Sequence, residues 1–528
     1  MNPTEAQRSA PLYPVLFLAA FVFIFAAMNR VASVYDEGLI LTGAMRVGNG
    51  EIPHRDFYAN YGPAQFYVVA LLFKLFGPSV MTERLWDFTI KAAIATLGFA
   101  AVRSYCRPAA AFAAYAACLI WLAAFGSPGF PLFPATLFSL AATLLVASSG
   151  GQNQQRTRIV AAGGCVGLTA LFRYDVGCLA GAALTALLIV SAVYRRERFW
   201  RIPTSRLWLF ALGVVAVFGP VALAYLLAGG PVRAFIHDVL YASTYYVQMR
   251  RLPFPSLDAL WKGPFESAVY LPPAVVAVAL ALGASRRSSG SLGWVIAAFA
   301  ALCVALYLKG WVRMSVLHTS GAIIVALILV PMLWKSASGQ LARRALVFMC
   351  IVLAAVPTFF ALKASVAVAM SNRQFVADFI LRRDAACDAP AHLSPVACIY
   401  IGAARGEAVK FVIEHVAKDE RLFVGTTRHD KIFVNDNLIY FAAQRLPATH
   451  WHHYDPGLQS RVDVQNEMVA ELERQTVRYI VLISDWDNVT EPNASALSSG
   501  VTILDDYIRL HYEIVRQYGT ISVLTRRK

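Results

Sequence analysis

Apolar stretches of roughly 15–23 residues recur through the first two thirds of the chain, and each is about long enough, as a helix, to cross a bilayer. They lie near 13–33, 81–101, 109–125, 133–149, 158–172, 176–194, 207–229, 268–284, 292–308, 317–334 and 345–362. The two stretches flanking Arg173 are short and could instead form one bent hairpin. Only 15% of the 528 residues are charged, against about 25% in soluble domains. We therefore predict an α-helical polytopic membrane protein with about 11 transmembrane helices.

The net charge of +15 lies within this apolar part. Residues 1–362 hold 28 basic and 12 acidic residues, whereas residues 363–528 hold 19 and 20. This distribution argues against a nucleic-acid partner. With a cytoplasmic N-terminus, the inner loops contain only Glu5 and Glu197 as acids and collect Arg8, Arg103, Arg107, Arg156, Arg158, Arg195, Arg196, Arg198, Arg201, Arg206, Arg286, Arg287, Lys335, Arg343 and Arg344. The positive-inside rule then places everything after residue 362 outside the cytoplasm.

The chain is thus divided into a membrane domain, 1–362, and an extracytoplasmic α/β domain, 363–528. Periodicity in the second domain predicts two amphipathic helices and three short strands. The helices cover Lys410–Ala417 and Val464–Gln475, and the strands cover Arg421–Val424, Arg478–Ile483 and Thr520–Leu524.

Cysteine and histidine residues mark two further features of the second domain. Cys387 and Cys398 lie at its start, in an oxidising compartment, where they could form a disulfide. His450, His452 and His453 lie in the sequence THWHHYD and could bind a metal. Because no second ligand cluster has a recognised spacing, a surface loop is the favoured interpretation.

The first outer loop, residues 34–80, is rich in ionisable groups. Asp36 and Glu37 follow the first span directly, and His54 and Asp56 come later in the loop. A carboxylate at the membrane interface is partly desolvated, which raises its pKa and suits it to accept a proton. Carboxylates with a nearby histidine could also hold a divalent cation. The alternative is that these acids only cap helices of the loop. The apolar segment from Pro63 to Gly77 predicts a helix lying along the interface.

Basic residues gather on the same outer side. Arg173 interrupts the apolar run between two spans, and its guanidinium is well matched to a phosphate. A structural ion pair of Arg173 with Asp175 or Glu37 is the alternative. Lys309, Arg313 and His318 lie at the outer end of two later spans, where snorkelling explains any one of them but explains the cluster less well.

Four features in this order resemble a known family. Asp36-Glu37 follows the first span, and Tyr61-Gly62-Pro63-Ala64-Gln65-Phe66-Tyr67 precedes Phe76-Gly77-Pro78 and Arg84. The third feature is Gly167-Leu168-Thr169-Ala170-Leu171-Phe172-Arg173, and the fourth runs from Arg313 to Pro331. The chain resembles the GT-C membrane glycosyltransferases, in particular the branch of protein O-mannosyltransferases, lipid A aminoarabinose transferases and rhizobial lipopolysaccharide glycosyltransferases. It departs from that branch at Gly62, where members often carry proline, and at Arg173, where they usually carry lysine. These departures indicate a divergent subfamily.

The resemblance implies a hexosyl- or pentosyltransferase of the bacterial inner or plasma membrane that uses a polyprenyl-phosphate sugar donor. The sugar would pass, with inversion, to a hydroxyl of a cell-surface glycan, lipid or protein on the outer face. By similarity, Asp36 would be the general base, with Glu37 and Asp56 as further catalytic residues. The substrate-binding set would be His54, Arg84, Arg173, Asp175, Arg313 and His318. The resemblance assigns no definite cofactor, and a divalent cation on Asp36, Glu37 and His54 remains open.

Two other classes of function compete with this reading. One is a transporter or flippase with an outer domain, and the other is a non-catalytic protein of surface-polysaccharide assembly. Transporters place ionisable residues near the membrane midplane and contain paired broken helices. The candidates here gather at the outer ends of the spans, with none centred in a long span, which favours the enzyme.

Overall fold

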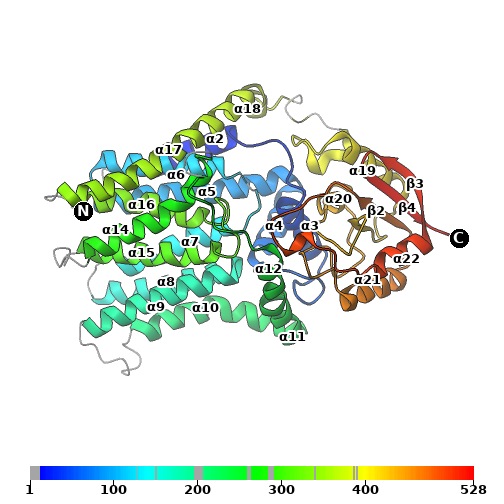
Figure 1. Ribbon diagram of the computed structural model, residues 1–528, viewed down its shortest axis with the longest axis horizontal. Helices are drawn as coiled ribbons and strands as arrows, with labels where there is room; N and C mark the ends of the chain where they lie inside the picture. Colours follow the sequence, from blue (N-terminus) through cyan, green and yellow to red (C-terminus); the bar gives the residue numbers. More distant parts are fainter. Residues whose placement is uncertain are drawn as a thin grey trace.

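The computed structural model describes residues 12–126, 128–148, 152–194, 206–258, 263–283, 291–337, 341–383, 387 and 390–528. A helical body and a smaller α/β part lie side by side along the long axis of the molecule (Figure 1). Of the residues used to predict topology, Glu5, Arg8, Arg195, Arg196, Glu197, Arg198, Arg201, Arg286 and Arg287 lie outside the described residues.

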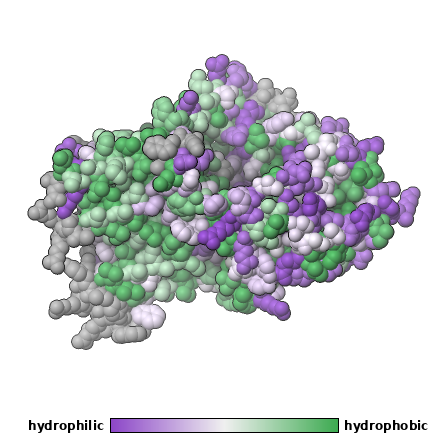
Figure 2. Space-filling view, viewed as in Figure 1, coloured by the Kyte–Doolittle hydropathy of each residue, from purple (hydrophilic) through white to green (hydrophobic). Residues whose placement is uncertain are grey.

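The helical body follows the predicted apolar stretches. It contains α2 (Leu12–Ala26), α5 (Val80–Arg103), α6 (Pro108–Ala124), α7 (Leu132–Ala147), α8 (Gln152–Phe172), α9 (Tyr174–Tyr194), α10 (Arg206–Leu227), α14 (Leu271–Gly283), α15 (Ser291–Gly310), α16 (Ser320–Ser336) and α17 (Leu341–Ser371). Among the described residues, six helices are long and apolar enough to cross a membrane, and shorter apolar helices accompany them. On the face that Figure 2 shows, apolar residues predominate over this body, and hydrophilic residues are more frequent over the α/β part. The predicted helical membrane protein is confirmed.

Two details of the body differ from the expectation. The stretches around Arg173 form separate helices of 21 residues each, α8 and α9, which meet in a tight turn at that residue. The span α5 also buries Glu83, Arg84, Asp87 and Lys91 in its first half. Of these four residues, only Arg84 is among the site residues predicted from the sequence. Protein surrounds these groups, and an ion pair of 2.7 Å joins Lys91 Nζ to Asp87 Oδ2.

The first outer loop is largely helical. It contains α3 (Asp36–Gly48) and α4 (Ala64–Phe76), and the second of these matches the predicted interfacial helix. Leu71, Leu75 and Phe76 on α4 are exposed, as expected for a helix that faces lipid. A second long loop, between α10 and α14, has internal helices that the sequence analysis did not predict. It contains α11 (Val232–Ile236), the π-helical turn η1 (His237–Tyr241), α12 (Ala242–Arg250) and η2 (Glu266–Tyr270).

The α/β part begins after α17, which continues past residue 362 to Ser371. It contains α18 (Arg373–Ile380), η4 (Ala391–Val396), α19 (Ala403–His415), β1 (Phe423–Thr426), α20 (Leu438–Ala443), α21 (Val462–Arg474), β2 (Tyr479–Ile483), η5 (Ala494–Ala496), α22 (Ile503–His511), β3 (Tyr512–Tyr518) and β4 (Ile521–Arg526). Both predicted helices and all three predicted strands are present, whereas the helices α18, α20 and α22 and the strand β3 were not predicted. The structure also joins Cys387 and Cys398 as a disulfide, with their Cα atoms 4.2 Å apart.

The four strands form one sheet in the order β1-β2-β4-β3. β1 is parallel to β2, with Phe423 opposite Ile480, and the other two pairs are antiparallel. Successive side chains of a strand point to opposite faces. Accordingly, Val481 packs in a cluster with α19 and α20, whereas Ile480 packs in a cluster with α21 and α22. Both faces of the sheet are therefore covered by helices.

The α/β part rests on the first outer loop. Thr42 of α3 donates a hydrogen bond of 2.7 Å to the carbonyl oxygen of Asn437, next to α20. Arg46 of α3 donates to the carbonyl oxygen of Thr449 at 2.9 Å, and Arg421 pairs with Glu51 at 2.7 Å. Buried charged groups held by several partners at once fix orientation more strictly than apolar contact alone. These contacts position the loop around His453 against the start of α3.

Candidate active site

Asp36 begins α3 and is half-buried. The hydroxyl of Tyr61 donates to its Oδ1 over 3.5 Å, which is a long hydrogen bond. Burial raises the pKa of Asp36, against the opposing attraction of His453, Arg173 and Arg250. A carboxylate with a raised pKa is a better proton acceptor near neutral pH than an ordinary aspartate. This environment is the one expected of a general base, and the catalytic role of Asp36 stays a prediction.

Arg173 and Asp36 both contact Tyr61, so the two charged groups lie close together. The guanidinium lies 4.9 Å from the centre of the Tyr61 ring. It also donates to both carboxylate oxygens of Asp175, at 3.0 and 2.7 Å. Of the two ion pairs that the sequence analysis considered for Arg173, the structure contains the one with Asp175. No Arg173–Glu37 pair occurs among the described ion pairs.

Gly62 fixes the position of Tyr61. Its N–H donates to the carbonyl oxygen of Phe172 at 3.1 Å, at the end of α8. A Cβ at this position would lie 2.1 Å from the carbonyl oxygen of Leu171. Only glycine permits so close an approach of two backbones. The departure from the family pattern at Gly62 therefore has a local steric reason.

Lys309 ends α15 on the same side of the body. Its Nζ is buried and has no hydrogen-bond partner among the described residues. It lies 5.3 Å from the centre of the Phe130 ring, which is also 5.8 Å from the Arg173 guanidinium. A buried polar atom without a partner is rare in native structures and marks a place where a ligand can bind.

Arg313 and His318 already have partners. Arg313 forms a two-pronged ion pair with Glu491 of the α/β part, and its Nη1 lies 2.7 Å from Oε2. Arg250 reaches the same carboxylate at 3.4 Å. His318 Nδ1 lies 2.8 Å from Ser315 Oγ. Burial, together with the nearby cations Lys309 and Arg313, lowers the pKa of His318 and keeps its ring neutral. Neither residue presents a free charge to a phosphate.

Glu37 and Arg84 form a fully buried pair. Arg84 Nε and Nη2 donate to the two carboxylate oxygens at 2.6 and 3.0 Å. The same guanidinium donates to the carbonyl oxygens of Asn29 and Val31, so it ties the end of α2 to α3 and α5. This geometry is that of a structural ion pair. It does not fit the predicted roles of Glu37 in catalysis and Arg84 in substrate binding.

His54 and Asp56 lie in separate hydrogen-bond networks. His54 is buried between Asp238, 3.0 Å from Nδ1, and the hydroxyl of Tyr174, 3.1 Å from Nε2. Asp56 accepts from the backbone N–H of Ile52 at 2.7 Å and from the neighbouring Arg55. These contacts shape the loop itself, so they do not fit a catalytic Asp56 or a His54 that binds substrate.

The predicted metal set is not assembled. Asp36, Glu37 and His54 each contact a different side chain: Tyr61, Arg84 and Asp238 respectively. In the parts of the chain that the structure describes, no group of three or more His, Cys, Asp or Glu residues could hold a metal ion. These residues do not fit a divalent cation, and no step of the proposed chemistry passes through one.

The α/β part supplies residues that the sequence reasoning missed. His452 and His453 are fully buried, so the predicted surface loop is wrong at these positions. Asp455 accepts from the hydroxyls of Tyr35 and Tyr58, at 3.1 and 2.8 Å. The sequence THWHHYD contains several aromatic side chains with polar atoms. This density could have indicated burial, since such side chains usually find hydrogen-bond partners when they are buried.

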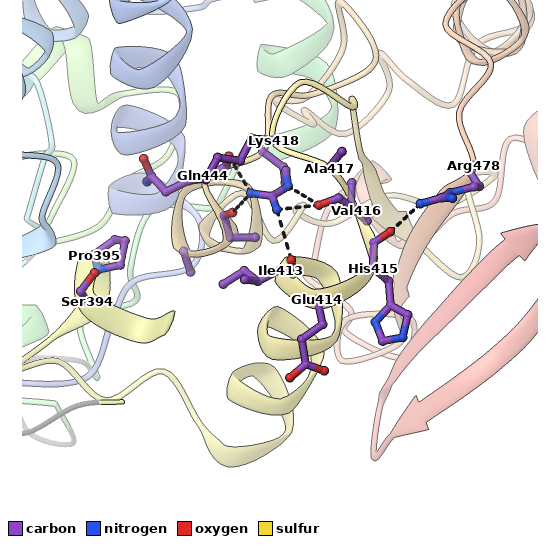
Figure 3. A pocket seen from close by; sticks show the side chains of 13 residues that line it. Ser394, Pro395, Ile413, Glu414, His415, Val416, Ala417, Lys418, Gln444 and Arg478 are labelled. Carbon is purple, nitrogen blue, oxygen red and sulfur yellow. Dashed lines mark hydrogen bonds between the residues drawn. The ribbon is translucent and has the colours of Figure 1, made fainter. Parts of the chain in front are cut away.

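Two cavities lie away from these residues. One, of about 750 Å³, is lined by the C-terminal ends of α19 and α20 (Figure 3), where Arg445 donates to the carbonyl oxygen of Val416 at 2.6 Å. The other, of about 570 Å³, is an apolar groove between α6, α16 and α17. Neither is lined by a residue of the candidate site.

Comparison with known proteins identifies the fold. No family model matches the sequence, and no curated protein matches it. ArnT from Cupriavidus metallidurans in the apo state covers 98% of this chain and is itself covered to 98%, with 16% identity and a TM-score of 0.58. The same protein bound to undecaprenyl phosphate has 14% identity, the same coverage and a TM-score of 0.54.

A second protein extends the comparison to archaea. The oligosaccharyltransferase AglB from Archaeoglobus fulgidus, in complex with an inhibitory peptide and a dolichol-phosphate, covers 98% of this chain. It is itself covered to 74%, with 12% identity and a TM-score of 0.53. ArnT and AglB are both members of the GT-C superfamily. The chain therefore has the fold of the GT-C membrane glycosyltransferases.

Proposed function

We propose that this protein is a membrane glycosyltransferase that moves a sugar from a polyprenyl-phosphate donor to an acceptor hydroxyl at the outer face of the membrane. The observation that carries the proposal is the position of Asp36 within a GT-C fold. This half-buried carboxylate lies beside Arg173, on the side of the body where Lys309 presents a buried amine that makes no hydrogen bond to a described residue. ArnT and AglB, which share the fold, have structures with bound undecaprenyl phosphate and with a dolichol-phosphate respectively.

The chemistry is one displacement at the anomeric carbon. Asp36 takes the proton from the acceptor hydroxyl as its oxygen attacks the anomeric carbon. The bond from that carbon to the phosphate oxygen breaks, and the polyprenyl phosphate leaves with the bonding electron pair. A single displacement inverts the anomeric configuration. Arg173 and Lys309 stabilise the charge that grows on the phosphate, and preorganised cations of this kind supply much of an enzyme's rate enhancement.

The remaining predicted site residues support this arrangement. Glu37 and Arg84 hold the start of α3, on which Asp36 lies. Asp175 orients Arg173 through its two hydrogen bonds. Arg313 joins the membrane part to the α/β part through Glu491. His54 and Asp56 shape the loop that carries Tyr61.

The proposed orientation has the N-terminus in the cytoplasm and the α/β part outside. Its support is the separation of charges along the body. Lys335, at the end of α16, donates a hydrogen bond to the carbonyl oxygen of Tyr105, in the turn between α5 and α6. The basic residues of that turn and of the end of α16 therefore lie at the same end of the helical body. The helix α3, which carries Asp36, lies at the other end, next to the α/β part (Figure 1). A cell-surface acceptor is accessible only from that side.

The test is direct transfer by the full-length protein in lipid nanodiscs. A panel of radiolabelled undecaprenyl-phosphate sugars is supplied with envelope glycolipid extracted from the native host. We expect one donor to label the glycolipid and to release undecaprenyl phosphate. Arg173→Ala should raise the apparent KM for the donor. Absence of transfer from every donor, together with movement of the lipid across sealed vesicles, would establish a flippase and overturn the proposal.

A further inference from the structure

The apolar groove between α6, α16 and α17 opens on the surface of the helical body, where its lining residues Trp334 and Phe359 are exposed. Thr358 is the one lining residue with a hydroxyl, and this group already accepts a hydrogen bond from Trp121 Nε1 at 2.8 Å. Along α6 the groove runs from Ala110 to Ile120, which is about 15 Å of helix. A bilayer has a hydrocarbon core of about 30 Å, so this length is half its thickness. The groove therefore has the character and the length to hold an acyl chain from one leaflet.

Basic side chains surround one end of this groove. Lys335 follows the lining residue Trp334 directly, and its ammonium donates a hydrogen bond to the carbonyl oxygen of Tyr105. Arg107 lies two residues further along the chain, at the N-cap of α6. The end of α16 and the start of α6 thus bring two cations to the same end of the groove.

The third helix adds another cation there. α17 begins five residues after α16 ends, so its first turn lies at the same end of the body. Arg344 lies in that turn, seven residues before the lining residue Ile351. Seven residues are two helical turns, so Arg344 shares the face of α17 that lines the groove.

These cations have no acidic counterpart. The helices α6, α16 and α17 contain no aspartate or glutamate. Arg107 and Arg344 are exposed, and neither forms an ion pair with a residue that the structure describes. Unmatched cations next to one another attract an anion together. A tryptophan at the same end, Trp334, is typical of the boundary between lipid tails and headgroups.

We infer that the groove binds an anionic phospholipid, with an acyl chain between the three helices and the headgroup phosphate on Lys335, Arg107 and Arg344. Basic pockets between transmembrane helices are sites for anionic lipid headgroups. The positive-inside rule accounts for basic loops, but it does not account for an apolar groove that ends at them. An apolar transmembrane helix would also cover the groove, but it would leave the three cations unmatched. The inference is independent of the proposed function, because Asp36 lies at the other end of the body.

Native mass spectrometry of the full-length protein in detergent measures the headgroup contacts. The probes are phosphatidylglycerol and zwitterionic phosphatidylcholine with the same acyl chains. We expect saturable binding that is tighter for phosphatidylglycerol. Arg107→Gln and Arg344→Gln should each raise the Kd for phosphatidylglycerol roughly fivefold and leave that for phosphatidylcholine unchanged. Lys363→Gln is the matched control and should change neither, because Lys363 is exposed beside Leu362 at the opposite end of the groove.

A second pair of variants tests the groove itself. Ala113 lines the groove and is exposed, so Ala113→Phe places a ring in the groove without entering the core. We expect this variant to lose saturable binding of phosphatidylglycerol. Ala116→Phe, at an exposed position of the same helix outside the groove, should bind as wild type. Melting temperatures without added lipid show that each variant is folded.

Several results would overturn the inference while the proposed function stands. They are equal affinity for the two lipids, wild-type affinity in folded Ala113→Phe, and a loss of binding in Lys363→Gln that the two arginine variants do not share. A dimer of this chain that Ala113→Phe abolishes would assign the groove to a second copy. Displacement of phosphatidylglycerol by undecaprenyl phosphate would assign it to the donor's tail, and either result would overturn the inference.

Discussion

Replacement of Lys309 by methionine should weaken donor binding and stabilise the empty protein at the same time. Methionine has nearly the length and shape of lysine without its charge. In the structure, Lys309 Nζ is buried, makes no hydrogen bond to a described residue and lies 5.3 Å from the centre of the Phe130 ring. The empty protein therefore bears the cost of a desolvated, unpaired amine, and a bound phosphate would offset it.

The affinity for the donor should fall while the stability of the empty protein should rise, and the two changes differ in size. A hydrogen bond between charged groups contributes about 1.5–3 kcal/mol, so its loss should raise the Kd for undecaprenyl phosphate roughly 10- to 150-fold. Removal of an unpaired buried polar group should stabilise the empty protein by about 1–2 kcal/mol. The melting temperature should then rise by roughly 1–2 °C, since the shift for a given energy falls with chain size.

Titration with undecaprenyl phosphate and a thermal melt of the same detergent-solubilised samples measure both effects. Lys410→Met, at an exposed position on α19, is the matched control and should change neither quantity. A variant of Lys309 that melts lower and binds as wild type would show that the ammonium has a structural partner, and would refute the reasoning.

Three further predictions concern the site and its supports. Gly62→Ala should sharply lower stability and transfer, because its Cβ would lie 2.1 Å from a backbone oxygen of α8; yield and melting temperature measure this. The acid limb of the pH–rate profile should lie above that of an ordinary aspartate, because the raised pKa of Asp36 delays its ionisation until higher pH. Arg173→Ala should move this limb to still higher pH, because Arg173 lowers that pKa. Mass spectrometry without reductant should find Cys387 and Cys398 linked.

Each of these has its own control. Gly48→Ala changes a glycine whose Cβ would meet nothing within 4 Å, so it should leave yield and melting unchanged. An acid limb that Arg173→Ala leaves in place would remove the electrostatic link between Arg173 and Asp36. Free thiols at both cysteines would reject the disulfide.

Hydropathy was enough to predict the helical body and the interfacial helix α4, because a bilayer permits few ways to satisfy backbone polar groups. It was also enough to place Asp36 and Arg173 on the same side. It could not separate Asp36 from Glu37, which are neighbours in sequence. On a helix they point about 100° apart, so Glu37 turns to Arg84.

The contribution of the α/β part to the candidate site could not be predicted from the sequence for a different reason. His453 and Asp455 reach the site through tertiary contacts with Tyr35 and Tyr58, more than 390 residues earlier. No local period reports such a contact. The edge strand β3 escaped prediction because most of its side chains are exposed or half-buried, so its apolar pattern is weak.

The central claim is that Asp36 is the base of a glycosyl transfer, and Asp36→Asn tests it most directly. The asparagine keeps the shape of the side chain and removes its ability to take a proton. With a folded variant that binds undecaprenyl phosphate at least as tightly as wild type, the account predicts a transfer rate about 10²–10⁴-fold lower, the usual contribution of a general base. A rate within a few-fold of wild type in that variant would contradict it.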